Sequence, residues 1–230
     1  MTKTIGVLAH VDAGKTTFSE ALLYHGKAIR QKGRVDHKDA LLDFDDIEKE
    51  RGITVFSGVA HFAFGEDEYY LVDTPGHVDF SGEMERTLGV LDCAVLLLSA
   101  SDGIQGHTAA IWRLLERHNI PTFLFLNKCD QSGADPDAVL RQVQQRFSQN
   151  ALFFPQSGMD GALAEALAER DDVLLETYLD TGFERTVWLE HTAKLVQDRA
   201  VFPCLGLVCC VCCCPPAAGS QPGLMSSSLM

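Results

Sequence analysis

The chain has 230 residues, of which 46% are hydrophobic and 22% charged, a composition typical of a globular protein with one sizeable domain, alone or with an appendage. A formal net charge of −13 excludes a protein held to nucleic acid by bulk electrostatics alone. No secretory signal opens the chain, and no apolar run reaches the ~20 residues that a membrane span requires. We therefore expect a cytoplasmic protein with neither a membrane partner nor a direct nucleic-acid site, in which Cys93 and Cys129 are buried, reduced thiols.

Patterns typical of strands alternate with patterns typical of helices through the first 150 residues. We expect strands at residues 3–9, 53–64, 68–72, 93–99 and 120–126, and helices at 15–25, 82–89, 105–118 and 135–147. The second and third strands are expected to pair antiparallel, and the polar stretch 26–52 to form a long loop. Asp135 and Pro136 predict the cap and the first turn of the last helix. Buried strands that alternate with helices predict an α/β fold with a mainly parallel sheet covered on both faces.

The character of the chain changes after residue 150. Residues 150–200 have leucines at helical spacing and no strand pattern, so we expect a helical insertion there. Residues 201–205 predict a final strand. No residue after Arg199 carries a formal charge, and six of the eight cysteines lie between Cys204 and Cys214. We therefore expect residues 206–230 to form an atypical tail rich in Cys, Pro and Ser.

The stretch Ile5–Glu20, IGVLAHVDAGKTTFSE, combines a buried strand, a loop that closes on Gly-Lys-Thr, and a helix. This order is typical of a phosphate-binding loop, in which backbone N–H groups and the helix N-terminus surround the phosphates. Lys15 is expected to reach the β- and γ-phosphates, and the Thr16 hydroxyl to bind Mg²⁺. Ala9 stands where the usual pattern has glycine, so an ordinary strand, turn and helix is the alternative. Asp12 either organises the loop, holds a cation, or is a satisfied turn carboxylate.

Two further motifs contain candidate ligands for the metal and the γ-phosphate. In YYLVDTPGHVDF, Asp73 ends a hydrophobic strand, where a nucleotidase needs a carboxylate for Mg²⁺. Gly76 can present an unobstructed N–H to a γ-phosphate, and His77 can orient or polarise a water molecule. In RGIT, Thr54 is a candidate second hydroxyl ligand of Mg²⁺. Taken alone, the first motif also fits a strand that ends in a Pro-Gly turn, and the second fits a plain strand start.

The tetrapeptide NKCD, Asn127–Asp130, directly follows a buried strand. The Asp130 carboxylate can accept hydrogen bonds from N1 and N2 of guanine, where adenine has no such pair of donors. Asn127 can bond the edge of the base, and Lys128 can lie along it. Four residues alone fit a solvated turn better than a base-binding site. Their position favours a guanine site, because nucleotides bind outside the carboxyl ends of the strands in such sheets.

Together these segments resemble the translational GTPases, and within them elongation factor G and the tetracycline-resistance ribosomal protection proteins. The matching segments are AHVDAGKTT (Ala9–Thr17), ERGIT (Glu50–Thr54), DTPGHVDF (Asp73–Phe80), VLD (Val90–Asp92), SASDGIQ (Ser99–Gln105) and NKCD (Asn127–Asp130). Alanine at position 9 is normal in this family, and the DTPGHVDF motif distinguishes translation factors from Ras-like GTPases. The segment LLYHGKAIRQKGRVD, Leu22–Asp36, is closer to the ribosomal protection group.

The resemblance implies a P-loop GTPase domain over residues 1–205 that binds GTP or GDP, uses Mg²⁺, and acts on the ribosome. The implied nucleotide-binding residues are Asp12, Ala13, Gly14, Lys15, Thr16, Thr17, Gly76, Asn127, Lys128 and Asp130. The implied metal ligands are Thr16, Thr54 and Asp73. His77 is the implied catalytic residue, because in the family this histidine positions the attacking water.

The resemblance ends at VFPCLG, Val201–Gly206, after which the family has a Ser-Ala pair, a closing helix and further domains. This chain continues with LVCCVCCCPPAAGSQPGLMSSSLM. The tail is open to three explanations: a cysteine metal module, a palmitoylated anchor, or out-of-frame translation after a frame shift, which the sudden loss of charge favours. We expect one face of the sheet to lack cover and the product to be marginally stable. A truncated, non-catalytic nucleotide-binding remnant is the alternative to an active GTPase.

Overall fold

The computed structural model describes residues 1–29, 58–74, 81–155, 157–180 and 185–206. Its strands are β1 (Thr2–Ala9), β2 (Gly58–Phe64), β3 (Asp67–Asp73), β4 (Cys93–Ser99), β5 (Thr122–Asn127), β6 (Ala151–Phe153) and β7 (Phe202–Gly206). Its helices are α1 (Lys15–His25), α3 (Ser81–Leu88), α4 (Gly106–Arg117), α5 (Pro136–Arg146), α6 (Gly161–Ala168), α7 (Asp172–Asp180) and α8 (Arg185–Gln197).

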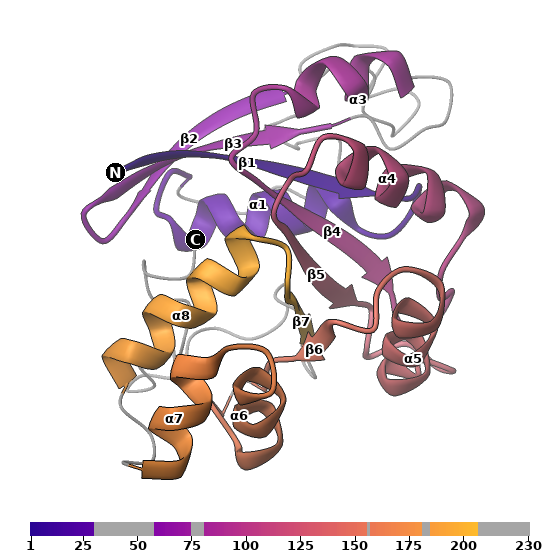
Figure 1. Cartoon of the computed structure of the whole chain (residues 1–230). Coiled ribbons are helices and arrows are strands. Elements are labelled where there is room, and N and C mark those ends of the chain that lie inside the picture. Colours follow the sequence, from indigo (N-terminus) through magenta and orange to yellow (C-terminus); the bar gives the residue numbers. More distant parts are fainter. Residues whose placement is uncertain (30–57, 75–80, 156, 181–184, 207–230) are drawn as a thin grey trace, which may run out of the picture.

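The strands form one seven-stranded sheet in the order β2-β3-β1-β4-β5-β7-β6, which Figure 1 shows with its helices. Neighbouring strands are parallel except β2 and β3, which form the antiparallel pair. The prediction of an α/β fold with a mainly parallel sheet is therefore confirmed. The part of the second expected strand that precedes Gly58, and the long loop apart from its first residues, fall outside the described residues.

One strand was not expected. Ala151–Phe153 forms β6 and pairs with β7, with Ala151 opposite Phe202, so the prediction that residues 150–200 contain no strand is wrong. A strand of three residues is too short to show an alternating pattern, and only its pairing with β7 defines it. The three helices α6, α7 and α8 follow it, in the region where helical leucine spacing predicted helices.

Alternation of side chains along the strands divides the core into two layers, one on each face of the sheet. On one face, Leu8, Leu96 and Leu126 share a cluster with residues of α3, α4 and α5. On the other, Val7 and Val95 share a cluster with residues of α1. Among the helices in these two clusters, three therefore cover one face and α1 covers the other (Figure 1).

Helices α6 and α8 and the N-terminal half of α7 bury a separate core around Trp188, whose side chain is fully buried. Asp171 precedes α7 and accepts hydrogen bonds from the backbone N–H groups of Val173 and Leu174, each at 3.0 Å. His191 of α8 places Nδ1 3.0 Å from an Asp171 carboxylate oxygen. This carboxylate thus caps one helix and ties it to the next.

The remaining local predictions have mixed outcomes. Asp135 Oδ1 accepts a hydrogen bond from the Ala138 N–H at 2.8 Å, as expected of a cap before Pro136. Cys93 is buried, but Cys129 is only half-buried, so its predicted burial is wrong. Cys129 follows the end of β5 and lies at the margin of the core rather than within it. In the part of the chain that the structure describes, no helix is both long and apolar enough to cross a membrane.

Candidate functional site

Three of the predicted segments lie at the same edge of the sheet. The loop after β1 leads into α1 at Lys15, β3 ends at Asp73, and β5 ends at Asn127. Because β3, β1, β4 and β5 are consecutive and parallel, their carboxyl ends share one edge. Ligands of open α/β sheets bind outside this edge. The fold therefore brings the predicted phosphate, metal and base residues to one place.

The loop between β1 and α1 has a tightly constrained backbone. Asp12 and Gly14 have φ values of 63° and 90°, in the left-handed region that favours glycine. A Cβ atom added at Gly14 would lie 2.4 Å from Asn127 Nδ2, so any other residue there would displace the Asn127 amide as well as strain the backbone. Asp12 is exposed, whereas Thr16 and Thr17 are half-buried in the first turn of α1. The first turn of α1 contains no acidic residue, which suits an anion at this helix N-terminus.

Lys15 and Asp73 form a buried ion pair beneath this loop. Lys15 Nζ donates to Asp73 Oδ2 at 2.7 Å, and the Lys15 side chain is 8% exposed. The Ser19 hydroxyl donates to Asp73 Oδ1 at 3.2 Å, so both carboxylate oxygens are engaged. The structure thus places the lysine predicted to bind phosphate and the carboxylate predicted to bind a metal in direct contact.

The donor set at this edge suits Mg²⁺ bound together with phosphates. Thr16 offers a hydroxyl and Asp73 a carboxylate, and Mg²⁺ prefers such oxygen ligands. Across the described ranges, no three His, Cys, Asp or Glu side chains gather closely enough to hold a metal ion on their own. This pattern matches Mg²⁺ sites in which one or two side chains act with substrate phosphates and water.

Asn127 links the third segment to the first. Its amide Nδ2 donates to the carbonyl oxygen of Ala13 at 2.9 Å. This nitrogen therefore contacts the loop between β1 and α1, whereas the sequence predicted a contact with the edge of a base. Lys128 follows with a left-handed φ of 60°, and the Asp130 side chain is exposed. The backbone therefore turns sharply after β5 and leaves the Asp130 carboxylate available to a ligand.

A hydrogen-bonded cluster beside this turn had no role assigned from the sequence. Ser99 ends β4, and its hydroxyl donates to Asp102 Oδ2 at 2.6 Å. The Ser101 hydroxyl donates to Gln131 Oε1 at 3.0 Å, which ties the loop after β4 to the loop after β5. The Ser99 hydrogen bond is the main cause that lowers the pKa of Asp102, and the positive charge of Lys128 adds to it. The segment SASDGIQ contains Ser99, Ser101 and Asp102, but only the fold reveals that they contact the loop after β5 through Gln131.

The predicted residues therefore divide into two groups. Those that the structure brings to this edge are Asp12, Ala13, Gly14, Lys15, Thr16, Thr17, Asp73, Asn127, Lys128 and Asp130. Thr54, Gly76 and His77 lie outside the described residues. The structure therefore gives the positions of the predicted phosphate and base residues, and their roles, like those of the residues facing the γ-phosphate, stay predictions.

Comparison with known proteins gives a consistent picture. The model of the elongation factor Tu GTP binding domain matches residues 2–205. The chain is 42% identical over 195 residues to the oxytetracycline resistance protein of Streptomyces rimosus, an alignment that covers 76% of this chain and 29% of that protein. It is 37% identical over 210 residues to the tetracycline resistance protein TetW of Butyrivibrio fibrisolvens, covering 86% of this chain and 33% of that protein.

A solved structure agrees with these sequence relatives. The crystal structure of a protein from Thermus thermophilus superposes with a TM-score of 0.80 at 25% identity, covering 90% of this chain and 37% of that one. The chain spans about a third of the length of its tetracycline resistance relatives. The resemblance predicted from the motifs is confirmed: the chain belongs to the family of elongation factor Tu GTP-binding domains, as a translational GTPase domain related to tetracycline resistance proteins.

Proposed function

We propose that this chain binds GTP and GDP through the loops at the carboxyl edge of its sheet. Lys15 and the amides at the start of α1 would hold the phosphates, and Asp130 would accept the N1–H and N2–H donors of guanine. Thr16 and Asp73 would hold Mg²⁺, which neutralises phosphate charge. The observation that carries this proposal is the meeting of Lys15, Asp73 and Asn127 at one edge, since they come from three separate segments.

Calorimetry on the full chain tests nucleotide binding directly. With Mg²⁺ present, GTP and GDP should release heat on binding and saturate at one site, whereas ATP should not. Equal binding of ATP would overturn the role of Asp130. Absence of binding by either guanine nucleotide would overturn the proposal as a whole.

We further propose Mg²⁺-dependent hydrolysis of GTP to GDP and phosphate, in the cytoplasm and in contact with the ribosome. In this scheme His77 orients the attacking water, Gly76 donates its N–H to the γ-phosphate, and Thr54 supplies a hydroxyl to Mg²⁺. The support is the similarity of the chain to tetracycline resistance proteins and the GTP-binding family match. Phosphate release measured with and without ribosomes tests it. A His77→Ala chain that hydrolyses GTP as fast as the parent in the presence of ribosomes would refute the role of His77.

The second candidate function is a nucleotide-binding remnant without catalytic coupling. The motivating observation is the tail, in which LVCCVCCC follows Gly206 with no charged residue. We propose that residues 206–230 are out-of-frame translation, which sequencing of the gene around Leu205 will test. Nucleotide affinity and ribosome-stimulated hydrolysis measured on one preparation separate the two functions: binding without stimulation selects the remnant.

A further inference from the structure

The loop after β5, residues 127–135, is tied at both ends to one residue of the loop after β4. The N–H of Ala100 donates to the Asn127 carbonyl oxygen at 2.8 Å, and the Asp135 N–H donates to the Ala100 carbonyl oxygen at 3.0 Å. Ala100 is buried, so these two hydrogen bonds are shielded from water and are electrostatically stronger than they would be in solution. A neighbouring loop therefore fixes both ends of the loop that contains the predicted guanine residues.

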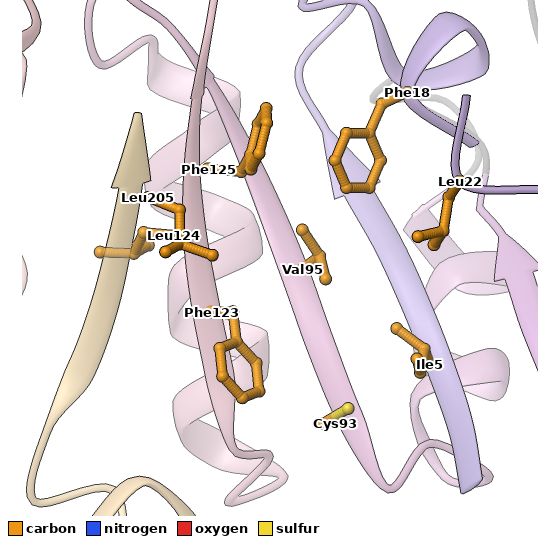
Figure 2. Close-up of a pocket in the computed structure, with 9 residues that line it drawn as sticks. All are labelled: Ile5, Phe18, Leu22, Cys93, Val95, Phe123, Leu124, Phe125 and Leu205. Carbon is orange, nitrogen blue, oxygen red and sulfur yellow. The ribbon is translucent and has the colours of Figure 1, made fainter. Parts of the chain in front are cut away.

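The strands below these two loops are held by the core. Phe125 lies two residues before the end of β5, and its ring packs against that of Phe18 of α1 with centroids 4.7 Å apart. Figure 2 shows the two rings together with Val95 of β4, which belongs to the same core cluster. The apolar cavity that these three residues help to line has a volume of only about 20 Å³. The close packing leaves the ends of β4 and β5 little room to shift.

A side-chain hydrogen bond ties the middle of the β5 loop as well. The Ser101 hydroxyl donates to Gln131 Oε1 at 3.0 Å, and Gln131 directly follows Asp130, whose side chain is exposed. Two residues before Asp130, Lys128 has a left-handed φ of 60°, a conformation that a residue other than glycine keeps only where its surroundings hold it. The position of Asp130 thus depends on a contact that its neighbour makes with the loop after β4.

The hydrogen bond between Ser101 and Gln131 is one end of a chain that runs back to β4. Ser101 Oγ lies 3.0 Å from Ser99 Oγ, and the Ser99 hydroxyl donates to Asp102 Oδ2 at 2.6 Å. The Asp102 N–H donates in turn to Ser99 Oγ at 3.2 Å, and Ser99 is buried. The chain ends on a carboxylate, which makes stronger hydrogen bonds than a neutral acceptor. The position of Ser101 is therefore fixed by the buried end of β4.

We propose that Ser101, acting through Gln131, positions the Asp130 carboxylate for the two donors of guanine and so sets the base specificity of the chain. This inference rests on the proposed nucleotide site and adds two positioning residues that lie outside the NKCD tetrapeptide. Asp130 must accept from N1–H and N2–H of guanine at once, so its orientation matters more for guanine than for hypoxanthine. Hypoxanthine keeps N1–H and lacks the N2 amine.

Calorimetry on the full chain with Mg²⁺ tests the inference by comparing GDP with inosine diphosphate. The test variants are Ser101→Ala, Gln131→Ala and the double variant, and Ser101→Thr restores the hydroxyl. Ser132→Ala and Gln145→Ala are the matched controls, because both residues are exposed, one in the same loop and the other on α5. Urea unfolding of each protein reports stability separately from binding.

The parent should bind GDP at least roughly tenfold more tightly than inosine diphosphate, because one hydrogen bond to a carboxylate is lost. In Ser101→Ala and in Gln131→Ala, GDP affinity should fall about fivefold and inosine diphosphate affinity only about twofold, which lowers the ratio. The double variant should bind as each single variant does, because both substitutions remove the same contact. Ser101→Thr and the two controls should keep the ratio of the parent.

A merely structural role would lower both affinities equally or change only the unfolding, so an unchanged ratio in the two single variants would overturn the inference. Losses that multiply in the double variant would also overturn it, and either result leaves the proposed function intact. A parent that does not prefer GDP would overturn the proposed function and this inference together. If Ser101→Ala shows no cooperative unfolding, the ratio in Gln131→Ala decides, since Gln131 is exposed.

Discussion

Lys15 at the start of α1 and Asp73 at the end of β3 form a 2.7 Å ion pair, although 58 residues separate them in the sequence. The Asp73 side chain is fully buried, so its charge is shielded from water. Breaking a buried pair by removing one partner typically costs about 3–5 kcal/mol, because the other charge is left uncompensated. The same two residues are therefore important for stability and for the proposed binding of phosphate and Mg²⁺.

The Lys15→Met variant should lower the free energy of unfolding by about 3 kcal/mol or more and abolish binding of GTP. Adding Asp73→Asn removes the orphaned charge, so the double variant should regain part of that stability without regaining GTP binding. Urea unfolding and calorimetry measure the two effects. Lys27→Met, at an exposed position, is the matched control. A Lys15→Met protein as stable as Lys27→Met would show that the ion pair contributes nothing.

The Asp130→Asn variant should exchange one base preference for another. Guanine loses two hydrogen bonds to a carboxylate, each worth about 1.5–3 kcal/mol, so GTP affinity should fall at least about a hundredfold. Xanthosine triphosphate carries an oxygen at C2 that the new amide can reach as a donor, so its affinity should rise. Competition binding measures both changes. Asp137→Asn, an exposed carboxylate in the first turn of α5, should leave both affinities unchanged, and an equal loss there would point to a general charge effect.

Comparing Gly14→Ala with Gly65→Ala should separate the effect of backbone strain from the effect of the contact with Asn127. An L-residue in a left-handed conformation costs about 1–2 kcal/mol. The new methyl group would also lie 2.4 Å from Asn127 Nδ2 and would displace that amide. Gly65 has a similar φ of 65° but no neighbour within 4 Å of an added Cβ. Both Gly14→Ala and Gly65→Ala should destabilise folding, while only Gly14→Ala should weaken nucleotide binding. Retention of full affinity by Gly14→Ala would exclude a role for the Asn127 to Ala13 hydrogen bond.

The stability of the α6–α8 core should depend on acid pH through Asp171. Burial raises the pKa of this carboxyl, but hydrogen bonds from His191 and from the Leu174 and Val173 amides outweigh burial, and the pKa is lowered overall. The folded state therefore binds this proton less readily than the unfolded state. The contribution of Asp171 is present above about pH 4, the ordinary carboxyl value, and is lost as pH falls through the lowered pKa.

Acid unfolding followed by tryptophan fluorescence tests this dependence, since Trp188 is buried in the same core. The Asp171→Asn variant should be less stable than the parent at pH 7, and the difference should shrink as the pH falls below about 4. Loss of a helix cap alone costs about 1 kcal/mol. Asp198→Asn, at an exposed site, should not change the profile. A difference between Asp171→Asn and the parent that is constant from pH 7 to pH 2 would contradict the assignment.

Much of the fold could be predicted because its signals are local. The apolar run CAVLLLS gives β4 with the observed bounds, and Asp135 before Pro136 gives the cap of α5. The loops of the candidate site follow from sharp transitions between strands and polar residues. Strand β6 could not be predicted, because three residues carry no periodicity and pairing with β7 alone defines them.

Contacts between segments that lie far apart in the chain could not be predicted from the sequence. The ion pair of Lys15 and Asp73 joins two residues that were each assigned to a ligand, and no local pattern shows that they meet. The same holds for Asn127, which was expected at a base edge, whereas its amide nitrogen is bonded to the phosphate loop. Ser19 and Ser99 had no assigned role, because a serine inside a helix or at a strand end gives no signal until its partner is known.

The hydrogen bond from Asn127 to the carbonyl of Ala13 has an energetic consequence for ligand discrimination. Since the Asn127 side chain joins the two loops of the proposed nucleotide site, a poorly fitting base should also weaken the binding of the phosphates. Substitutions in the two loops should then fail to add, with a coupling energy of about 0.5–3 kcal/mol in a double-mutant cycle. Base selectivity and phosphate affinity should therefore be energetically coupled.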